Sequence, residues 1–542
     1  MTTAAQRLLA ALILVAASGV LDAGQAPSRR VRNPHEIYRE LAIDPASAGK
    51  VMEVFPAFHD YHDMIMFHPK FGYYASGRVN FDDDYQTFPI VMAPVFGHMI
   101  AEHLFQMWDG MRKAGTLGQK DTFTIGEFGA GDGALAESIL EYIQSQAGAR
   151  EGWAEFAKQA VYVCYDRSPA LSRIQKQRNQ RFGARFDARV ADATDLTATI
   201  KPGSLKGVML SNELPDAFSV HKVILTTTGA PEVAFVAPSL SESSWGRIRP
   251  MLSSGLAAQV EAGDAMIERT FMRNVRSSTV YLTKDTFTSL LEATVTRPDY
   301  ASVASSLEFH EIYVPVTAIP DLAAHLRRYA KTYADVLARD KEGILTYVNL
   351  GVEKMVQGAA QILAAGYVVT IDYGATWDGI LSNDGSKHLR TYGPAHRAAG
   401  AEINENNDSV DDVQTSNPYD HPTLNDLTTD VNFSLLDVEG RQAGLRTLYF
   451  GSQKALQSGT PVSLDAVPER ARGDNRVDQF LSWVEDFRAP GVFKVMIQQK
   501  DGTDSRYKFP DDAPEPLEPR GAGLTPEQQQ IAAAIVRRLS GK

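Results

Sequence analysis

The segment Thr122–Leu140, TFTIGEFGAGDGALAESIL, constrains the fold of this chain more than any other. It predicts a β-strand, a glycine turn and the start of a helix. Glu127, Gly129, Gly131 and Gly133 give the pattern E-x-G-x-G-x-G. Glycine lets a backbone approach a ligand closely or adopt a positive φ without a Cβ penalty. The helix that follows directs unpaired N–H groups over the turn. We therefore expect a ligand there, although a glycine turn without a ligand has the same pattern.

The glycine spacing separates this turn from two common nucleotide-binding loops. The dinucleotide fingerprint is G-x-G-x-x-G, which does not match, so a nicotinamide dehydrogenase is disfavoured. The P-loop pattern G-x-x-x-x-G-K-[ST] is absent. A strand followed by E-x-G-x-G-x-G instead resembles the S-adenosylmethionine (SAM) loop of class I methyltransferases.

Composition limits the remaining classes of function. The chain has 542 residues, a net charge of −12 and no long basic run. Nucleic-acid binding normally needs a basic surface that replaces phosphate counterions, so we expect no nucleic-acid partner. Cys164 is the sole cysteine, which excludes an intramolecular disulfide and a cysteine zinc site. The histidines show no metal-binding spacing, so no metal is predicted, and the G-x-S-x-G elbow of serine hydrolases is absent.

The N-terminus carries a second signal. Arg7 precedes the fourteen uncharged, mostly apolar residues Leu8–Leu21, and the small residues Gly24 and Ala26 follow. This is the layout of a secretory signal peptide, and the apolar run is short for a membrane span of about 20 residues. We expect residues 1–26 to be a signal peptide or membrane anchor of an exported, periplasmic or extracellular protein. A misassigned start codon or an ordinary helix is the alternative, and would place the chain in the cytoplasm or mitochondrial matrix.

The rest of the chain predicts a Rossmann-like α/β fold with a doubly wound sheet, because strands alternate with helices after residue 119. Residues 27–118 form an N-terminal helical region on the substrate side, and residues 119–500 form the core. The core contains a large, less regular insertion at about 226–306 and a long polar loop at 375–425. Residues 501–542 are a charged linker and a C-terminal helix.

Two acidic residues follow predicted strands. Asp166 ends the strand Val161–Asp166, where an acid in a doubly wound fold accepts hydrogen bonds from ribose hydroxyls. Asp192 follows the predicted strand Arg185–Ala191, where an adenine contact is expected. Both residues are also ordinary turn formers.

The segment Ser211–His221, SNELPDAFSVH, places Asn212, Glu213, Asp216 and His221 after a buried strand. Ligands bind at this carboxyl edge in open α/β sheets. Such a cluster could align a nucleophile with a methyl sulfonium, and paired carboxylates suit the planar fork of a guanidinium. A polar loop that caps a helix is the alternative.

Three further residues are substrate-side candidates. Asp372 lies at the end of another buried strand, in Ile371–Gly374, and Tyr73 and Tyr74 lie beside glycines in His68–Gly77. Aromatic rings near a sulfonium contribute cation–π attraction, although such rings more often simply pack.

Taken in order, these segments resemble the MidA-like methyltransferases. That family includes the mitochondrial complex I assembly factor that methylates an arginine of a respiratory subunit. The resemblance spans roughly residues 35–500. It rests on FHPKFGYYASG, DYQTFPIVMAPVFG, EFGAGDGALAESIL, YDRSPALSRIQKQR, SNELPDAFSVH, EIYVP, GYVVTIDYG with HLRTYGPAHR, DLTTDVNF and FKVMIQQK.

The resemblance implies a class I methyltransferase fold, SAM as cofactor and a protein substrate, with arginine as the first expectation. It implies that the glycine turn holds SAM, that Asp166 binds its ribose, and that one cluster faces the acceptor. The residues concerned are Glu127, Gly129, Gly131 and Gly133 for SAM, and Asn212, Glu213 and Asp216 for the acceptor. The DLTTDVNF segment would lie near the active site.

The chain departs from the family pattern mainly on the acceptor side. Ile90 replaces a glutamate, Asp430 a histidine, Asn432 an aspartate and Ser219 a proline, whereas Asp166 for glutamate is conservative. Two functions therefore stay open. One is a SAM-dependent methyltransferase that acts on a protein side chain, and the other is a non-catalytic binding or assembly protein on the same fold.

Overall fold

The structure is a computed structural model that describes residues 40–76, 79, 87–272, 278–339, 343–381, 388–392, 417–469, 492–509, 517 and 523–540. The predicted signal peptide, residues 1–26, and most of the predicted polar loop 375–425 lie outside the described residues. No described helix is both long enough and apolar enough to cross a membrane.

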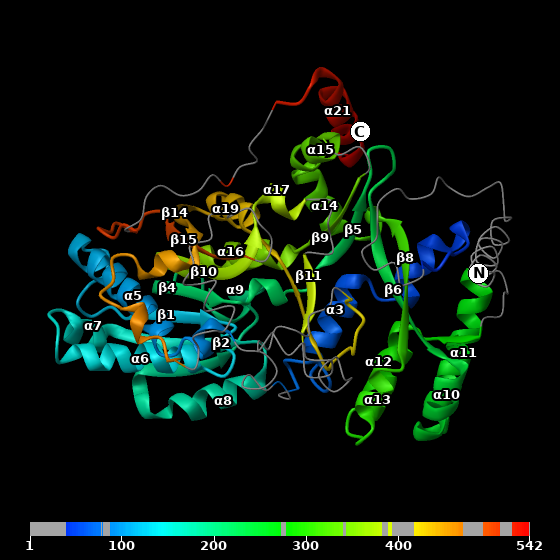
Figure 1. Cartoon of the computed structure of the whole chain (residues 1–542), viewed down its shortest axis with the longest axis horizontal. Helices are drawn as coiled ribbons and strands as arrows, with labels where there is room; N and C mark the ends of the chain where they lie inside the picture. The colour runs from blue at the N-terminus through cyan, green and yellow to red at the C-terminus, as the bar shows by residue number, and fades with distance from the viewer. Residues whose placement is uncertain are drawn as a thin grey trace, which may run out of the picture.

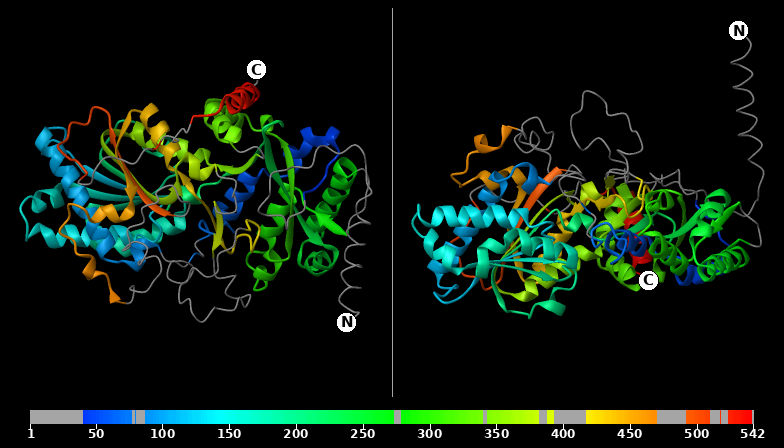
Figure 2. Two further views of the ribbon diagram at one scale, coloured as in Figure 1. Left: turned by 45° about the horizontal axis from the view of Figure 1, so that its top comes forward. Right: turned by 90° about the horizontal axis from the view of Figure 1, so that it is seen from below.

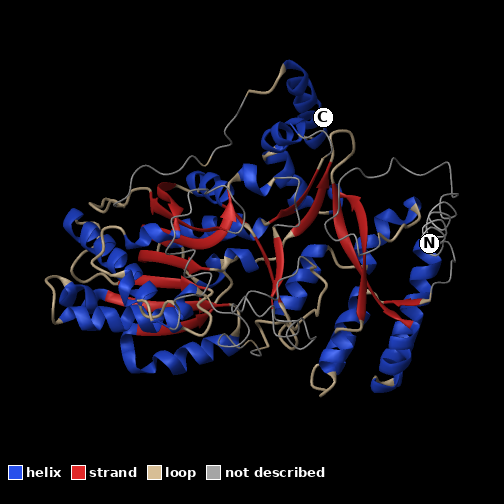
Figure 3. Ribbon diagram, in the orientation of Figure 1, coloured by secondary structure: helices blue, strands red, loops and turns tan. Residues whose placement is uncertain are grey.

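The molecule has two lobes, each built on its own sheet (Figures 1 and 3). The first lobe contains the glycine turn. The sheet of the second lobe is inserted in the sequence between two strands of the first lobe, β4 (Leu205–Asn212) and β10 (Leu363–Ala375). Helix α3 (Phe58–Phe67) packs on strands of the second lobe and lies between the two lobes in both views of the ribbon (Figure 2).

The first sheet has the strand order β14-β15-β10-β4-β1-β2-β3, with β13 paired to the end of β10. Strands β3, β2, β1, β4 and β10 are parallel, whereas β15 is antiparallel to both of its neighbours. This confirms the predicted doubly wound α/β sheet. Its other strands are β1 (Phe123–Phe128), β2 (Ala160–Asp166), β3 (Phe186–Val190), β13 (Val431–Asn432), β14 (Leu445–Ser452) and β15 (Val492–Lys500).

Side chains of the central strands pack alternately into two cores, as expected of a parallel sheet covered on both faces. Tyr162 and Cys164 of β2 join the core under α5, α6 and α7. Val163 and Tyr165 join the core that contains α16 and α19. The helices of this lobe are α4 (Phe88–Val91), α5 (Val95–Ala114), α6 (Ala134–Ala147), α7 (Trp153–Gln159), α8 (Pro169–Asn179), α9 (Leu196–Thr199), α16 (Leu350–Ile362), α17 (Trp377–Ile380) and α19 (Phe433–Gln442).

The second sheet is antiparallel, with the order β7-β6-β5-β9 and β8 also paired to β6. The sequence predicted a less regular insertion at about 226–306. The structure has regular elements there, and the sheet extends beyond that range at both ends. Its strands are β5 (His221–Leu225), β6 (Glu232–Ser241), β7 (Thr279–Tyr281), β8 (Leu307–Pro315) and β9 (Ile344–Val348).

A buried ion pair lies inside the second lobe. Lys222 Nζ is 2.7 Å from Glu311 Oε1, and neither side chain is exposed. The hydroxyls of Tyr419 and Tyr313 also donate to the Glu311 carboxylate, at 2.7 and 2.6 Å. These hydrogen bonds offset the cost of removing both charges from water, and Tyr419 ties a distant segment to this sheet.

The remaining described helices surround the second lobe and the junction between the lobes. Helix α21 begins after Thr525, whose side chain accepts a hydrogen bond from Gln528 N, and it packs against α15. Strands β11 (Leu389–Tyr392) and β12 (Asp426–Thr429) form a separate antiparallel pair. The helices are α2 (Val51–Val54), α10 (Glu242–Ile248), α11 (Ser254–Phe271), α12 (Lys284–Thr294), α13 (Tyr300–Ala304), α14 (Pro320–Arg328), α15 (Ala330–Arg339) and α21 (Pro526–Leu539).

Candidate functional site

A cavity of about 400 Å³ lies at the carboxyl ends of β1, β2 and β4. The chain runs outward through β2 and β3 on one flank of β1 and continues through β4 and β10 on the other. Open α/β sheets bind ligands at such a switch point, and this volume is in the usual range for small-molecule sites.

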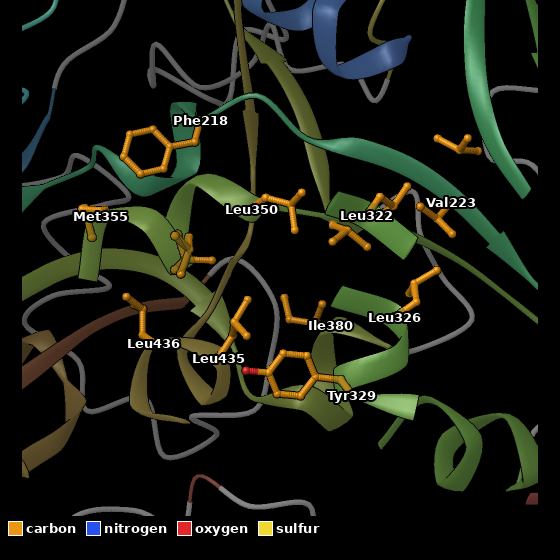
Figure 4. Packing of buried hydrophobic residues seen from close by; sticks show 14 of the residues in the cluster. Phe218, Val223, Leu322, Leu326, Tyr329, Leu350, Met355, Ile380, Leu435 and Leu436 are labelled. Atoms are coloured by element: carbon orange, nitrogen blue, oxygen red, sulfur yellow. The ribbon is translucent and has the colours of Figure 1, made fainter. Parts of the chain in front are cut away.

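The cavity has two sides, which we name by the segments that supply their residues. The glycine-loop side comes from residues after β1, β2 and β3: Gly129, Gly131, Asp166–Ser168 and Ala191–Thr194. The insertion side comes from α3, residues 213–221, residues 319–321 and α16. Phe218 and Leu350 of the insertion side also belong to the largest buried cluster (Figure 4).

The glycine turn has the backbone that its spacing predicted. Gly129, Gly131 and Gly133 have φ values of 68°, 51° and 84°. A Cβ atom at Gly129 would lie 2.6 Å from Leu214 Cδ1, and the positive φ there also disfavours any residue with a Cβ atom. Gly129 and Gly131 line the cavity, whereas Gly133 is the N-cap of α6. The turn thus presents bare backbone to the cavity.

Glu127 is buried under this turn and is not among the lining residues. Its Oε2 accepts a hydrogen bond of 2.7 Å from the Tyr162 hydroxyl. Burial raises the pKa of Glu127 to about 7. In the structure this side chain supports the strand beneath the turn.

Asp166 lines the cavity at the end of β2, and its carboxylate is held by two neighbours. Ser168 N donates to its Oδ1 at 2.8 Å, and Gln175 Nε2 lies 3.4 Å from its Oδ2. Gln175 Nε2 also donates to Gly131 O at 2.8 Å, so one α8 side chain links the glycine turn to Asp166. Burial raises the pKa of Asp166 to about 7 despite these hydrogen bonds.

Asp192 also lines the glycine-loop side. Its Oδ1 accepts hydrogen bonds from Thr194 N at 2.8 Å and from the Thr194 hydroxyl at 2.7 Å. Arg167 Nε lies 3.5 Å from its Oδ2. The Arg167 guanidinium also binds both carboxylate oxygens of Asp63, at 2.7 and 3.3 Å. Arg167 therefore connects the end of β3 to helix α3 across the cavity.

Glu213 lies on the insertion side, directly after β4. Its φ is 50°, an uncommon value for a residue with a Cβ atom. Its backbone N–H donates to Ile371 O at 2.8 Å, and its Oε1 accepts from Asn212 Nδ2 at 3.1 Å. Strained backbone of this kind is often found at functional sites. Asn212 itself does not line the cavity.

Asp216 and Asp372 lie beneath the cavity wall rather than on it. Asp216 Oδ2 accepts a 2.7 Å hydrogen bond from the Tyr373 hydroxyl, and Asp216 N donates to Asp372 Oδ2 at 3.2 Å. Burial raises the pKa of Asp216 to about 6. Burial, with Asp216 and Glu213 nearby, raises the pKa of Asp372 well above its ordinary value. These two acids form a buried layer behind Glu213.

The two predicted tyrosines occupy different positions. Tyr74 lines the cavity, and its hydroxyl donates to Asp426 Oδ2 at 2.9 Å. Tyr73 is buried in the core of the second lobe, with its ring edge-on to Tyr74 at 5.0 Å. Burial, followed by the charge of Asp216, raises the pKa of Asp426 to about 8.

His221, the first residue of β5, lines the insertion side and is 5 % exposed. Its ring stacks on that of His59 from α3, with 4.6 Å between centroids and 16° between planes. Burial, together with His59, lowers the pKa of His221 to about 3. The imidazole is therefore neutral at physiological pH.

Comparison with known proteins identifies the fold and the family. Residues 99–451 match the family described as "Putative S-adenosyl-L-methionine-dependent methyltransferase". The chain belongs to this family. The match covers the glycine turn and all five strands of the second sheet, whereas the cavity residues that α3 and Tyr74 supply precede it.

Two solved structures from Burkholderia thailandensis resemble this chain. One is a COG1565 superfamily member bound to S-adenosyl-homocysteine, at 19% identity and a TM-score of 0.50. The other is a native COG1565 superfamily protein, at 19% identity and a TM-score of 0.49. Each comparison covers 84% of this chain and 94% of the other. None of the curated proteins matches.

Membership of this family makes SAM the cofactor. The residues that line the cavity fit the chemical groups of SAM. SAM carries ribose hydroxyl donors, a sulfonium and an ammonium. The cavity offers bare glycine backbone and carboxylates on its walls. Six lining residues carry a carboxylate and two carry a permanent positive charge: Asp60, Asp63, Asp166, Asp192, Glu213 and Asp321, against Arg167 and Lys354. This balance favours a cationic ligand.

Two departures from the MidA-like pattern have structural roles here. Asp430 binds the Arg390 guanidinium through both oxygens, at 3.1 and 3.2 Å, and His388 Nδ1 at 3.0 Å. Burial raises the pKa of Asp430, but Arg390 and His388 together outweigh burial and lower the pKa to about 2. Asn432 accepts a hydrogen bond from Leu435 N and caps α19. Neither residue is among those that line the cavity.

The contribution of α3 and α16 to the cavity was not predicted from the amino-acid sequence. His59, Asp63 and Phe67 line the cavity from one face of α3, and their four-residue spacing was the available signal. Lys354 and Gly351 line it from α16. A Cβ atom at Gly351 would lie 2.8 Å from the Phe218 ring, so this glycine allows α16 to approach the wall.

Proposed function

We propose that this protein transfers the methyl group of SAM to a guanidinium nitrogen of a protein, with an arginine side chain as the acceptor. The observation that carries the proposal is Glu213, a strained acidic residue on the insertion side, directly after a strand that borders the switch point. The excess of carboxylates along the lining supports a cationic acceptor, because a guanidinium offers donors in a planar fork.

In this proposal the glycine-loop side binds SAM. Gly129 and Gly131 lie under the ligand, Asp166 accepts hydrogen bonds from the ribose and Asp192 lies near the adenine. Glu127 and Gly133 support the turn from below. When bound, SAM would supply a sulfonium methyl to the acceptor nitrogen, with sulfur keeping the electron pair of the broken carbon–sulfur bond. The acceptor nitrogen would lose one proton to solvent.

Glu213 orients the acceptor, and Asn212, Asp216 and Asp372 position Glu213 from behind. Asn212 Nδ2 contacts the Glu213 carboxylate directly. The protein contributes alignment and a suitable field rather than covalent chemistry. Tyr74 completes the wall, and Tyr73 supports Tyr74 from the core.

The experiment is a calorimetric titration of the full chain with SAM, followed by incubation of labelled SAM and the protein with a lysate from its own organism. We expect SAM binding and label on a protein arginine. Failure to bind millimolar SAM would favour the second candidate, a non-catalytic binding or assembly protein. Label on another residue type would remove the arginine part of the proposal.

Glu213→Gln tests the role of the carboxylate, because it keeps the shape and removes the charge. We expect nearly unchanged SAM affinity and methyl transfer lowered tenfold or more, about 1.4 kcal/mol of barrier. Glu155→Gln, at an exposed position on α7, is the matched control. Full-rate transfer in Glu213→Gln and in Asp216→Asn would make this cluster structural.

We also propose that residues 1–26 direct export or anchor the protein in a membrane. A fusion of residues 1–40 to a reporter that is active only outside the cytoplasm should become active. A silent fusion, beside a reporter with an established signal peptide that works, would place the protein with the cytoplasmic or mitochondrial SAM supply.

A further inference from the structure

The side chain of Arg167 reaches from the glycine-loop side of the cavity to helix α3. Its guanidinium binds both carboxylate oxygens of Asp63, at 2.7 and 3.3 Å, and its Nε lies 3.5 Å from Asp192 Oδ2. The guanidinium carbon also lies 4.8 Å from the centre of the Phe67 ring. All four residues line the cavity. Two ion pairs and a cation–π contact of one side chain therefore join the two sides.

Arg167 lies on the solvent side of the turn that follows β2. Its two neighbours in the chain, Asp166 and Ser168, are buried, whereas the Arg167 side chain is 43 % exposed. Asp166 and Asp192, on either side of this guanidinium in the lining, are the carboxylates that we assign to the cofactor. Arg167 is thus placed to cover a cofactor that binds to them.

The wall that Arg167 contacts is fixed, whereas Arg167 itself can move. Phe58, Tyr61 and Ile65 hold α3 in the core of the second lobe, so Asp63 has a fixed backbone. Arg167 has a long unbranched stem, and partly exposed side chains change rotamer within picoseconds to nanoseconds. The strength of its ion pairs therefore determines the fraction of time that the span between the two sides is open.

We propose that Arg167 is a gate for the cofactor: its ion pairs with Asp63 and Asp192 close the cavity over the cofactor, and they open each time an S-adenosyl compound enters or leaves. This inference rests on SAM binding and does not depend on the identity of the methyl acceptor. A gate that is equally stable with and without cofactor changes the rates of binding and release by the same factor, so the affinity stays the same. A residue that contacts the cofactor would instead change the affinity, mainly through the release rate.

The test measures both rates of S-adenosyl-homocysteine binding to the immobilised full chain by surface plasmon resonance. Arg167→Met keeps an unbranched apolar stem against Phe67 and removes the guanidinium. We expect association and dissociation to become faster by the same factor, about fivefold, as the loss of such ion pairs and of a cation–π contact implies. The dissociation constant, which is the ratio of the two rates, should stay the same.

A matched arginine on the same lobe provides the control. Arg181 also binds two carboxylates, those of Glu137 and Glu141, and lies 5.0 Å from the centre of the Phe182 ring. It is not among the lining residues. Arg181→Met should therefore change neither rate.

Two milder variants grade the effect and serve if Arg167→Met folds poorly. Arg167→Lys keeps the charge but loses the planar fork that binds Asp63 through two nitrogens. Asp63→Asn removes one of the two ion pairs and leaves Asp192. Both variants should increase the two rates by a smaller factor than Arg167→Met does.

Salt gives a readout that needs no substitution. Raising the salt from about 0.01 M to about 1 M shortens the screening length from about 30 Å to about 3 Å, which weakens ion pairs between partly exposed groups. S-adenosyl-homocysteine has one ammonium and one carboxylate, so its net charge is zero and salt acts mainly on the gate. Both rates should rise with salt in the unaltered chain, and they should rise less in Arg167→Met.

The outcomes separate this inference from the proposed function. Unchanged rates in Arg167→Met overturn the gate, and so does faster release alone with weaker binding, which would make Arg167 a cofactor contact. In both cases the cofactor still binds, and methyl transfer stands. Absence of S-adenosyl-homocysteine binding in the unaltered chain overturns the gate and methyl transfer together, whereas a methyl acceptor other than arginine leaves the gate in place.

Discussion

The two sides of the cavity are built in different ways. The glycine-loop side comes from three successive strand ends, so each of its polar residues follows a strand by a short step in the chain. The insertion side joins α3, the residues after β4, the start of α14 and α16, which are separated by up to about 300 residues in sequence. Local geometry determines the first side, and long-range packing determines the second.

The charged groups of the two sides show the same contrast between local and long-range contacts. On the glycine-loop side, Asp166 is held by hydrogen bonds to Ser168 and Gln175 from the adjoining helix. Behind the insertion side, distant segments are joined by buried charge contacts such as Asp430 with Arg390. We therefore expect substitutions on the first side to change SAM binding, and substitutions behind the second to change folding.

The largest expected effect is on stability, in Asp430→Ala. Removing this carboxylate breaks the buried ion pair with Arg390, which costs about 3–5 kcal/mol. Urea unfolding should show this loss, while SAM affinity of the folded fraction stays the same. Asp335→Ala, which breaks the surface pair with Lys331, should cost no more than about 1 kcal/mol. Equal losses in both variants would contradict a stabilising role for the buried pair behind the insertion side.

The second effect is on cofactor binding, in Gly131→Val. The positive φ of 51° at this position strains a branched residue, and its side chain would enter the cavity. SAM affinity measured by calorimetry should fall at least tenfold, about 1.4 kcal/mol. Gly148→Val is the control, because a Cβ atom there would meet nothing within 4 Å. Unchanged affinity in Gly131→Val would mean that SAM binds elsewhere.

The third effect is the pH dependence of SAM binding. Burial raises the pKa of Asp166 to about 7 in the unliganded protein, and ribose hydroxyls donate to its ionised form. Binding therefore releases a proton below pH 7, so SAM affinity should rise with pH up to about 7, by at most about tenfold per unit. Asp166→Asn should flatten this dependence. A profile that stays steep in the variant would assign the proton to another group.

The smallest effect concerns a helix cap behind the insertion side. Asn432→Ala removes the side chain that accepts from Leu435 N at the start of α19, and should cost about 1 kcal/mol of unfolding free energy. Asn432→Asp retains an acceptor and should be nearly neutral. If Asn432→Ala instead lowers methyl transfer without lowering stability, this residue belongs to the site.

Sequence reasoning worked where the signal was local. The glycine spacing, the acid at the end of β2 and the C-terminal helix each depend on a few neighbouring residues, and the structure has all three. For the segment Ser211–His221, the sequence predicted the polar cluster but not which of its side chains line the cavity. Of the four polar residues there, Glu213 and His221 line the cavity, and Asn212 and Asp216 lie behind it. A residue's orientation within a turn depends on what packs against it.

The amino-acid sequence by itself determined the doubly wound sheet and the glycine turn, because periodicity and turn chemistry act over short stretches of chain. The family followed from the resemblance of short motifs along the chain. Only the tertiary structure decided that α3 lines the cavity, that the insertion forms a second sheet, and that Asp430 pairs with Arg390 instead of lining the site. These features depend on contacts between residues that are far apart in the chain. The residues that make these contacts have no fixed spacing in the sequence, and tertiary packing alone brings them together.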